Sequence, residues 1–120
     1  MARAPEGVTR TPPEAIAQGL ALLQAGRPFH AHEVFEDQWK ASAGVERELW
    51  RGLAQIAVGL THRARGNERG AESLLARGAA SLETFADEKP YGLHVSAIVG
   101  WARSNSIDPT NFLIWCVEEH

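Results

Sequence analysis

Ionisable side chains lie on a helix face that should be apolar in the segment Phe29-His-Ala-His-Glu-Val-Phe-Glu-Asp-Gln-Trp39. The segment is typical of an amphipathic helix, and at about 100° per residue His32 points to the same side as the neighbouring aromatic residues. His32 and Glu36 are four residues apart, so their side chains meet on one face. We therefore expect a buried His–Glu pair among the aromatic side chains of this helix.

Three kinds of chemistry are open to this pair. In the first, His32 binds Glu36 or a backbone carbonyl and only fixes the packing of the helix. In the second, His32, Glu36 and His62 supply the three or so protein ligands that a divalent metal site needs. In the third, a desolvated His–Glu pair acts as a general acid or base. We expect the nearby aromatic side chains Phe29, Phe35 and Trp39 in the core. Trp39 could also line a pocket.

Gln55 is the only polar side chain in the uncharged run from Gly52 to Leu60. An unpaired buried amide costs roughly 1 to 3 kcal/mol, so Gln55 predicts a buried partner. The expected partners are His32, Glu36 or a backbone group. Any of these would join two helices in one polar network.

The elements that position these residues are predicted to be helices throughout. Thr11-Pro-Pro-Glu14 is typical of a capping box, and it opens a helix over 12–25 that ends before Gly26. Further helices are expected over 29–41 and 45–65, then from Asn67 onwards, and a fifth around 95–102. The sequence thus predicts an all-α, single-domain bundle of about five helices.

The helix over 45–65 is expected at the centre of the bundle, because a helix that is apolar on all sides must be covered on all sides. Gly52 and Gly59 are seven residues apart and therefore lie on nearly the same face. We expect a neighbouring helix to approach closely there. The predicted organisation is a flexible arm over 1–11, the bundle over 12–105, and an apolar C-terminal tail over 106–120.

A shift of forty residues superposes several helix and turn positions of the first half on the second. Gly26 falls on Gly66, Ala31 on Ala71, and Val34-Phe35 on Leu74-Leu75. The pattern predicts a duplicated helical hairpin, similar to tetratricopeptide repeats but with a longer period. The polar pair occurs in the first copy alone.

Composition limits the classes of partner. The chain has 120 residues and a formal net charge of -3, which does not favour binding to nucleic acid. A single cysteine excludes an internal disulfide and suits a reducing cytoplasm, where we expect the protein to be. The longest uncharged apolar run near the end, 112–117, is far too short to span a membrane. This tail must be covered by the core or by a second subunit, which makes a homo-oligomer one of the expected partners.

The motif residues together resemble those of domain of unknown function family 309. The residues that carry the resemblance, over about 15–100, are Phe29, His32, Glu33, Glu36, Trp39, Gly52, Leu53, Gln55, His62, Gly66, Asn67, Gly70 and Ala71. The resemblance implies a small all-helical bundle, and it implies a functional region rather than a reaction.

It also gives the candidate pocket residues, which are His32, Glu33, Glu36, Trp39, Gln55, His62 and Asn67. The expected function is a pocket for a small molecule or a divalent metal, built on a His–Glu–Gln cluster. The alternative is a helical-hairpin interaction module or homodimer without catalytic activity. The sequence does not identify the ligand.

Overall fold

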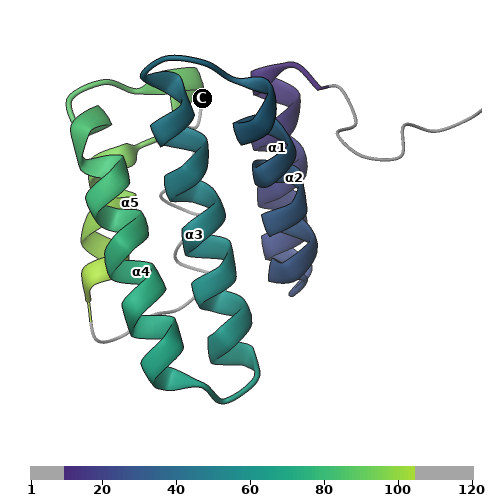
Figure 1. Ribbon diagram of the computed structural model, residues 1–120, viewed down its shortest axis with the longest axis vertical. Helices are drawn as coiled ribbons and strands as arrows, with labels where there is room; N and C mark the ends of the chain where they lie inside the picture. The colour runs from purple at the N-terminus through teal and green to yellow at the C-terminus, as the bar shows by residue number, and fades with distance from the viewer. Residues whose placement is uncertain (1–9, 105–120) are drawn as a thin grey trace, which may run out of the picture.

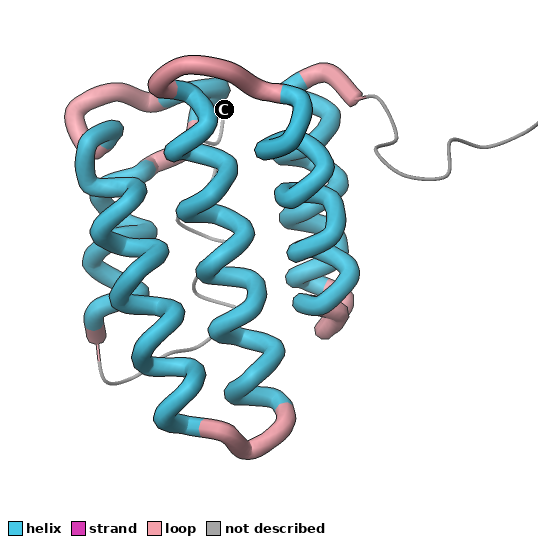
Figure 2. The backbone as a smooth tube through the Cα atoms, viewed as in Figure 1, coloured by secondary structure: helices cyan, strands magenta, loops and turns pink. Residues whose placement is uncertain are grey.

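Five α-helices and two short 3-10 turns make up residues 10–104, the part of the chain that the computed structural model describes (Figure 1). The helices are α1 (Pro12–Gln24), α2 (Pro28–Ala41), α3 (Glu46–Ala64), α4 (Glu68–Leu82) and α5 (Val95–Arg103), and the 3-10 turns are η1 (Glu83–Phe85) and η2 (Pro90–Gly92). Within these residues every regular element is a helix, as Figure 2 shows. The all-α prediction is confirmed, and the predicted ends of α1, α2 and α3 are correct to within one residue.

Helix α3 lies at the centre of the bundle. It packs against α2 on one side and α4 on the other, while α1 packs on α2 and α5 packs on α4 (Figure 1). The fully buried residues Trp50, Leu53 and Ile56 all belong to α3. The predicted central position of this helix is therefore confirmed.

Glycines bring the backbones of α3 and α4 together. A Cβ atom added to Gly59 would lie 2.9 Å from Leu75 Cγ, and one added to Gly52 would lie 2.8 Å from Leu82 Cγ. On the facing helix, a Cβ atom on Gly78 would lie 2.9 Å from the carbonyl oxygen of Gly52. These distances leave no room for a side chain, which confirms the close approach predicted from the glycine spacing.

Local signals account for the ends of the helices. The Thr11 side chain accepts a hydrogen bond from the backbone nitrogen of Glu14, and the Glu14 side chain accepts one from the backbone of Thr11, so the capping box is present. Gly26 and Gly66 end α1 and α3 with φ angles of +76° and +82°. Only glycine adopts such angles without strain.

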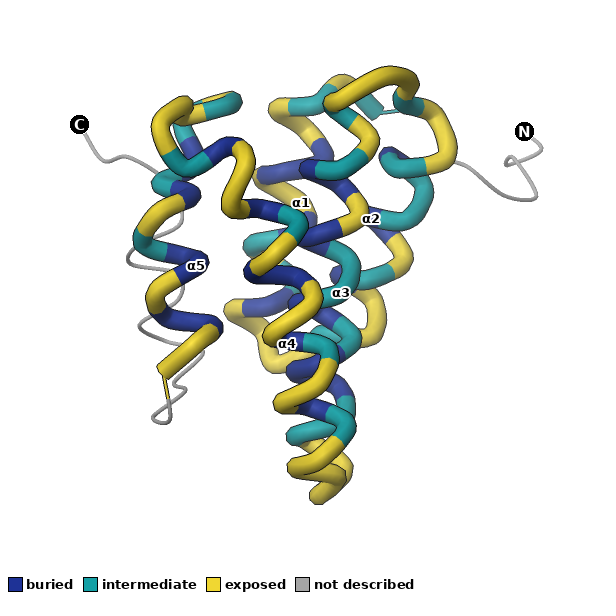
Figure 3. The backbone as a smooth tube through the Cα atoms, turned by 60° about the vertical axis from the view of Figure 1, so that its left-hand side comes forward, coloured by how far each residue is buried: buried dark blue, intermediate teal, exposed yellow. Residues whose placement is uncertain are grey.

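Burial alternates along the outer helices. Figure 3 shows buried and exposed residues following one another along α4 and α5, as expected for helices with one covered face. Within residues 10–104 no helix is both long and apolar enough to cross a lipid bilayer.

Two predicted segments fall largely outside the described residues. Of the predicted arm, residues 1–9 are outside, whereas Arg10 forms an ion pair with Asp37 at 3.2 Å and Thr11 caps α1. The predicted tail over 106–120, with its apolar run, also lies outside the description. The fold described here is therefore that of the bundle.

Candidate functional site

A groove on the face of α3 collects most of the predicted site residues. It has a volume of about 470 Å³. Its lining residues are His32, Glu36 and Trp39 from α2, Arg51, Ala54, Gln55 and Val58 from α3, and Leu74 from α4. The spacing explains the grouping, because residues separated by three, four or seven positions share one helix face. Four of the seven candidate pocket residues, namely His32, Glu36, Trp39 and Gln55, thus lie around one space.

The His–Glu pair forms, but it is more accessible than predicted. The Nε2 atom of His32 lies 3.5 Å from Oε1 of Glu36, and the two side chains are 21% and 41% exposed. The expectation of a buried pair is wrong, because the pair lines an open groove instead of a closed core. The Nδ1 atom of His32 is nevertheless buried and has no hydrogen-bond partner among the described residues.

The aromatic residues of α2 differ in their surroundings. Phe35 is fully buried, and Trp39 is partly buried against the core, with the guanidinium carbon of Arg47 4.4 Å from its ring centroid. Phe29 is 45% exposed, so its predicted place in the core is wrong. It lies in the first turn of α2, where its ring meets the ring of His32 at 5.6 Å between centroids instead of a covering helix.

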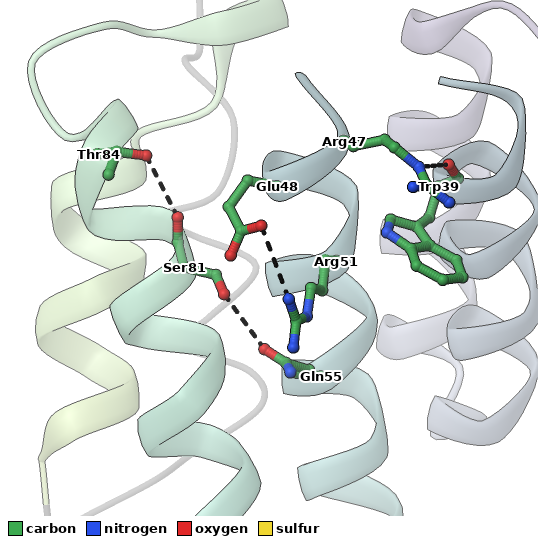
Figure 4. Close-up of polar contacts among 7 residues, drawn as sticks. All are labelled: Trp39, Arg47, Glu48, Arg51, Gln55, Ser81 and Thr84. Carbon is green, nitrogen blue, oxygen red and sulfur yellow. Dashed lines mark hydrogen bonds and ion pairs between the residues drawn. The ribbon is translucent and has the colours of Figure 1, made fainter. Parts of the chain in front are cut away.

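Gln55 has a partner on a different helix from the one predicted. Its Oε1 atom accepts a hydrogen bond of 3.4 Å from the hydroxyl of Ser81 on α4, as Figure 4 shows. The prediction of a bond to His32, Glu36 or the backbone is therefore wrong. Gln55 lies on the side of α3 that adjoins α4, so the polar contact joins α3 to α4.

Arg51 is the one charged groove residue that the sequence analysis did not name as a site residue. It lies one turn before Gln55 on α3, and its nearest acidic partner is Glu48, at 3.9 Å (Figure 4). The available signal was the spacing of Arg51, Ala54, Gln55 and Val58, which places all four on one face of the helix.

His62 and Asn67 meet each other at the turn between α3 and α4. Nδ1 of His62 lies 3.2 Å from Nδ2 of Asn67, and Oδ1 of Asn67 accepts a hydrogen bond from the backbone nitrogen of Gly70. Neither residue lines the groove. Asn67 is explained by its position as the N-cap of α4.

The structure does not bring the three predicted metal ligands together. His32 and Glu36 are paired in the groove, whereas His62 is held at the turn by Asn67. Residues 10–104 contain no group of three or more His, Cys, Asp or Glu side chains arranged to hold a metal ion. A site made of protein ligands alone would need about three of them, so this set does not fit. Glu33, the remaining candidate, is exposed and outside the groove.

A comparison with known proteins finds a matching family model for part of the chain. Residues 16–74 match the family model described as "Domain of unknown function (DUF309)". This segment of the chain is similar to the DUF309 family. All the residues that line the groove fall within these limits, from His32 to Leu74, so the groove belongs entirely to the DUF309 segment.

Part of the chain is also similar to a curated protein. The chain is 36% identical over 73 residues to the "Uncharacterized protein YpuF" of Bacillus subtilis (strain 168). The aligned region is 59% of this chain and 42% of the relative, so the chain spans less than half the length of that protein. No solved structure matches the chain. The geometry of the DUF309 groove is therefore the main guide to function.

Proposed function

We propose that the chain binds a small organic molecule in the groove between α2, α3 and α4. The observation that carries the proposal is the gathering of His32, Glu36, Trp39 and Gln55 around one space of about 470 Å³. Ligand sites in proteins are typically concave, roughly 300 to 1,000 Å³ in volume, and mostly apolar with a few polar groups. The groove has this character, since Ala54, Val58 and Leu74 contribute its apolar surface.

The unsatisfied nitrogen of His32 supports the same proposal. Buried side-chain polar atoms in folded proteins nearly always have a hydrogen-bond partner, so an exception needs an explanation. Nδ1 of His32 is such an exception among the described residues, and it belongs to a side chain that lines the groove. A ligand in the groove that hydrogen-bonds this nitrogen once the ring turns towards it would satisfy the atom.

The test is a fragment screen followed by a variant that fills the groove. Fragments that bind the 15N-labelled protein should shift the amide resonances of groove residues. Ala54→Phe places a ring on the floor of the groove and should abolish those shifts. Ala17→Phe is the matched control, because Ala17 lies on an exposed face of α1 outside the groove. Fragments that still bind Ala54→Phe, or a screen without groove ligands, would contradict the proposal.

The variant His32→Ala distinguishes a role of His32 in ligand binding from a role in the packing of the fold. Under the proposal this variant stays folded but loses affinity for groove ligands. If it fails to fold, as judged by circular dichroism, the role of His32 is structural. The neighbouring Glu33→Ala is the control, because Glu33 is exposed and does not line the groove.

A second candidate function is a hairpin interaction module that assembles with itself. The observation that favours it is that the two helical hairpins, α1–α2 and α3–α4, each turn at a glycine with a positive φ angle. Arrays of helix pairs often present binding surfaces to other proteins. Light scattering over a range of protein concentrations tests this idea. A monomer at every concentration would contradict the homodimer.

A further inference from the structure

We propose that the ligand of the groove is a monocarboxylate with an apolar body, whose carboxylate lies beside Arg51 and whose body lies along Ala54 and Val58 towards Leu74. This inference rests on the proposed function, because it names the class of ligand for the same groove. It depends on three observations: the donors on α3, the positions of the acidic side chains, and the apolar part of the groove.

The donors of α3 favour a negatively charged group. Arg51 and Gln55 are four residues apart, so they occupy successive turns of one helix face, and both line the groove (Figure 4). The Oε1 atom of Gln55 accepts the hydrogen bond from Ser81, which leaves the amide nitrogen as the end that can meet a ligand. Guanidinium and amide N–H groups only donate. Such donors bind a charged acceptor most strongly, and a guanidinium fits a carboxylate with two parallel bonds.

The nearby acidic side chains leave Arg51 accessible to a ligand. Glu48 lies 3.9 Å from Arg51, well beyond the length of about 2.8 Å typical of a charge-assisted hydrogen bond. Glu48 also lines a separate cavity together with Val45 and Phe85. The carboxylate of Glu36 lies beside His32 instead. A ligand carboxylate therefore meets a guanidinium whose ion pair with Glu48 is weak and exposed.

The rest of the groove favours an apolar body with one charge. Ala54 and Val58 follow Arg51 along the helix, and Leu74 of α4 adjoins them. Arg51 and Val58 are seven positions apart, which is about 10 Å at the rise of an α-helix. A second charge at the far end of such a ligand would lose its hydration against Val58 and Leu74, which is costly. A monoanion of about this length avoids that cost.

Three probes with the same body test the head group. The compounds 4-phenylbutyrate, 4-phenylbutanol and 4-phenylbutylamine carry an anionic, a neutral and a cationic head. Each is titrated into the full 15N-labelled chain, and affinities are taken from the shifts of groove resonances. We expect the butyrate to bind about tenfold more tightly than the alcohol, because charge-assisted hydrogen bonds are the stronger kind, and the amine to bind most weakly. Equal affinities, or a preference for the amine, would overturn the proposed ligand class.

Variants assign the preference to Arg51. Arg51→Gln should lower the affinity for the butyrate to that for the alcohol, and leave the affinity for the alcohol within about twofold of its original value. Arg77→Gln is the matched control, because Arg77 is an exposed arginine of α4 outside the groove. If Arg51→Gln keeps the full preference for the butyrate, the carboxylate does not lie beside Arg51 and the proposal is wrong.

The failure of this inference can be told apart from the failure of the proposed function. If the alcohol binds as tightly as the butyrate and Ala54→Phe abolishes both, the groove is a binding site but the ligand class is wrong. If none of the three probes binds although other fragments bind the groove, the ligand class is again wrong. If neither these probes nor any fragment binds the groove, the proposed function itself fails.

Discussion

The turn between α1 and α2 and the turn between α3 and α4 use the same backbone hydrogen bonds, forty residues apart. The nitrogen of Arg27 donates to the carbonyl of Leu22 at 2.9 Å, and the nitrogen of Asn67 donates to the carbonyl of His62 at 2.8 Å. Each turn contains a glycine with a positive φ angle, Gly26 in the first and Gly66 in the second. The first hairpin, α1–α2, and the second hairpin, α3–α4, thus reverse the chain in the same way.

The packing inside the two hairpins also corresponds. In the first, a Cβ atom on Gly19 would collide with the ring of Phe35, and in the second, a Cβ atom on Gly59 would lie 2.9 Å from Leu75 Cγ. Each glycine therefore receives a large side chain of the following helix, and the two pairs are again forty residues apart. This supports the interpretation of the chain as a duplicated hairpin.

The two hairpins differ where the groove is. Position 32 is histidine in the first and position 72 is glutamate in the second, while Glu36 corresponds to Ala76. His32 and Glu36 line the groove on α3, whereas Glu72 and Ala76 line another cavity, next to α5. The residues that the two hairpins share are the glycines of the turns and of the close helix contacts. The His32–Glu36 pair is present in the first hairpin alone and is not needed for that packing, as is expected of residues that serve a functional site.

The largest loss of stability should come from truncating the side chains that pack against Gly19 and Gly59, which are Phe35 and Leu75. Phe35 and Leu75 are each 1% exposed. Phe35→Ala should lower the free energy of unfolding by about 3 to 5 kcal/mol, and Leu75→Ala by about 2 to 5 kcal/mol, because each leaves a cavity in the core. Urea denaturation followed by far-UV circular dichroism measures both. If only one of the two variants loses less than about 1 kcal/mol of stability, the two hairpins are not packed in the same way.

A closer helix contact distinguishes the second hairpin. A Cβ atom on Gly78 would lie 2.7 Å from Ile56 Cγ1 and 2.9 Å from the backbone oxygen of Gly52, whereas position 38 of the first hairpin carries a buried glutamine. Gly78→Ala should therefore destabilise the protein by about 1 to 3 kcal/mol, because backbone cannot move aside as easily as a side chain.

The control for Gly78→Ala is the same substitution in open space. Gly100 lies in α5, and a Cβ atom there would have no neighbour within 4 Å. Gly100→Ala should raise the free energy of unfolding by up to about 1 kcal/mol through helix propensity alone. Equal effects of the two substitutions would show that the α3–α4 contact is looser than the structure indicates.

The start of the second helix gives a smaller contrast between the hairpins. Asn67 caps α4 through its hydrogen bond to the nitrogen of Gly70, whereas Arg27, at the corresponding position before α2, makes no side-chain cap. Asn67→Ala should lower the free energy of unfolding by about 1 kcal/mol, and Arg27→Ala should have a smaller effect.

Arg27→Asn tests whether the cap can be transferred. The backbone conformation of the two residues is similar, with φ of -122° at Arg27 and -95° at Asn67. The substitution should stabilise the protein by about 0.5 to 1 kcal/mol in thermal melts. Destabilisation would show that the two turns are less alike than their hydrogen bonds suggest.

Local features of the fold could be predicted from the sequence, because they depend on residues close together in the chain. The capping box at Thr11 and the glycines at 26 and 66 placed the helix ends correctly. The pairing of His32 with Glu36 follows from helical spacing. The central position of α3 follows from its uncharged run, since such a helix must be covered.

The polar contacts between helices could not be predicted, because they depend on how each helix is rotated against its neighbours. Gln55 was expected to bond His32, Glu36 or a backbone group, yet it bonds Ser81 of α4. His62 was a candidate metal ligand together with His32, yet it lies at the turn with Asn67. Arg51 was missed because an exposed charge on a helix is normally solvated and carries no distinguishing pattern.

The smallest expected change in stability concerns the N-terminus of α3. It is held in a different way from the N-terminus of α1, the first helix of the first hairpin. Helix α1 starts with a capping box, but the N-cap of α3, Val45, makes no side-chain hydrogen bond. Instead, Oε2 of Glu46 accepts hydrogen bonds from Nε1 of Trp50 at 3.1 Å and from the hydroxyl of Tyr91 at 2.7 Å. Tyr91 adopts a φ angle of +56°, which is uncommon for a residue other than glycine.

The hydrogen bond to Glu46 raises the pKa of Tyr91, and burial and the charge of Glu46 raise it further. The folded state therefore holds the tyrosine proton more tightly than the unfolded chain does. The resulting stabilisation is complete below the ordinary tyrosine pKa of 10.0 and is lost as the pH rises through the higher pKa of the folded state.

Replacing Tyr91 with phenylalanine tests this link. Because Tyr91 is 41% exposed, Tyr91→Phe should lower the free energy of unfolding at neutral pH by less than about 1 kcal/mol. The difference between the two proteins should stay constant up to about pH 10 and narrow above it, as the tyrosine ionises. Urea denaturation at a series of pH values measures it. If Tyr91→Phe leaves the free energy of unfolding unchanged at neutral pH, the ring, which phenylalanine retains and which stacks on Trp50, stabilises the start of α3 and the hydroxyl does not.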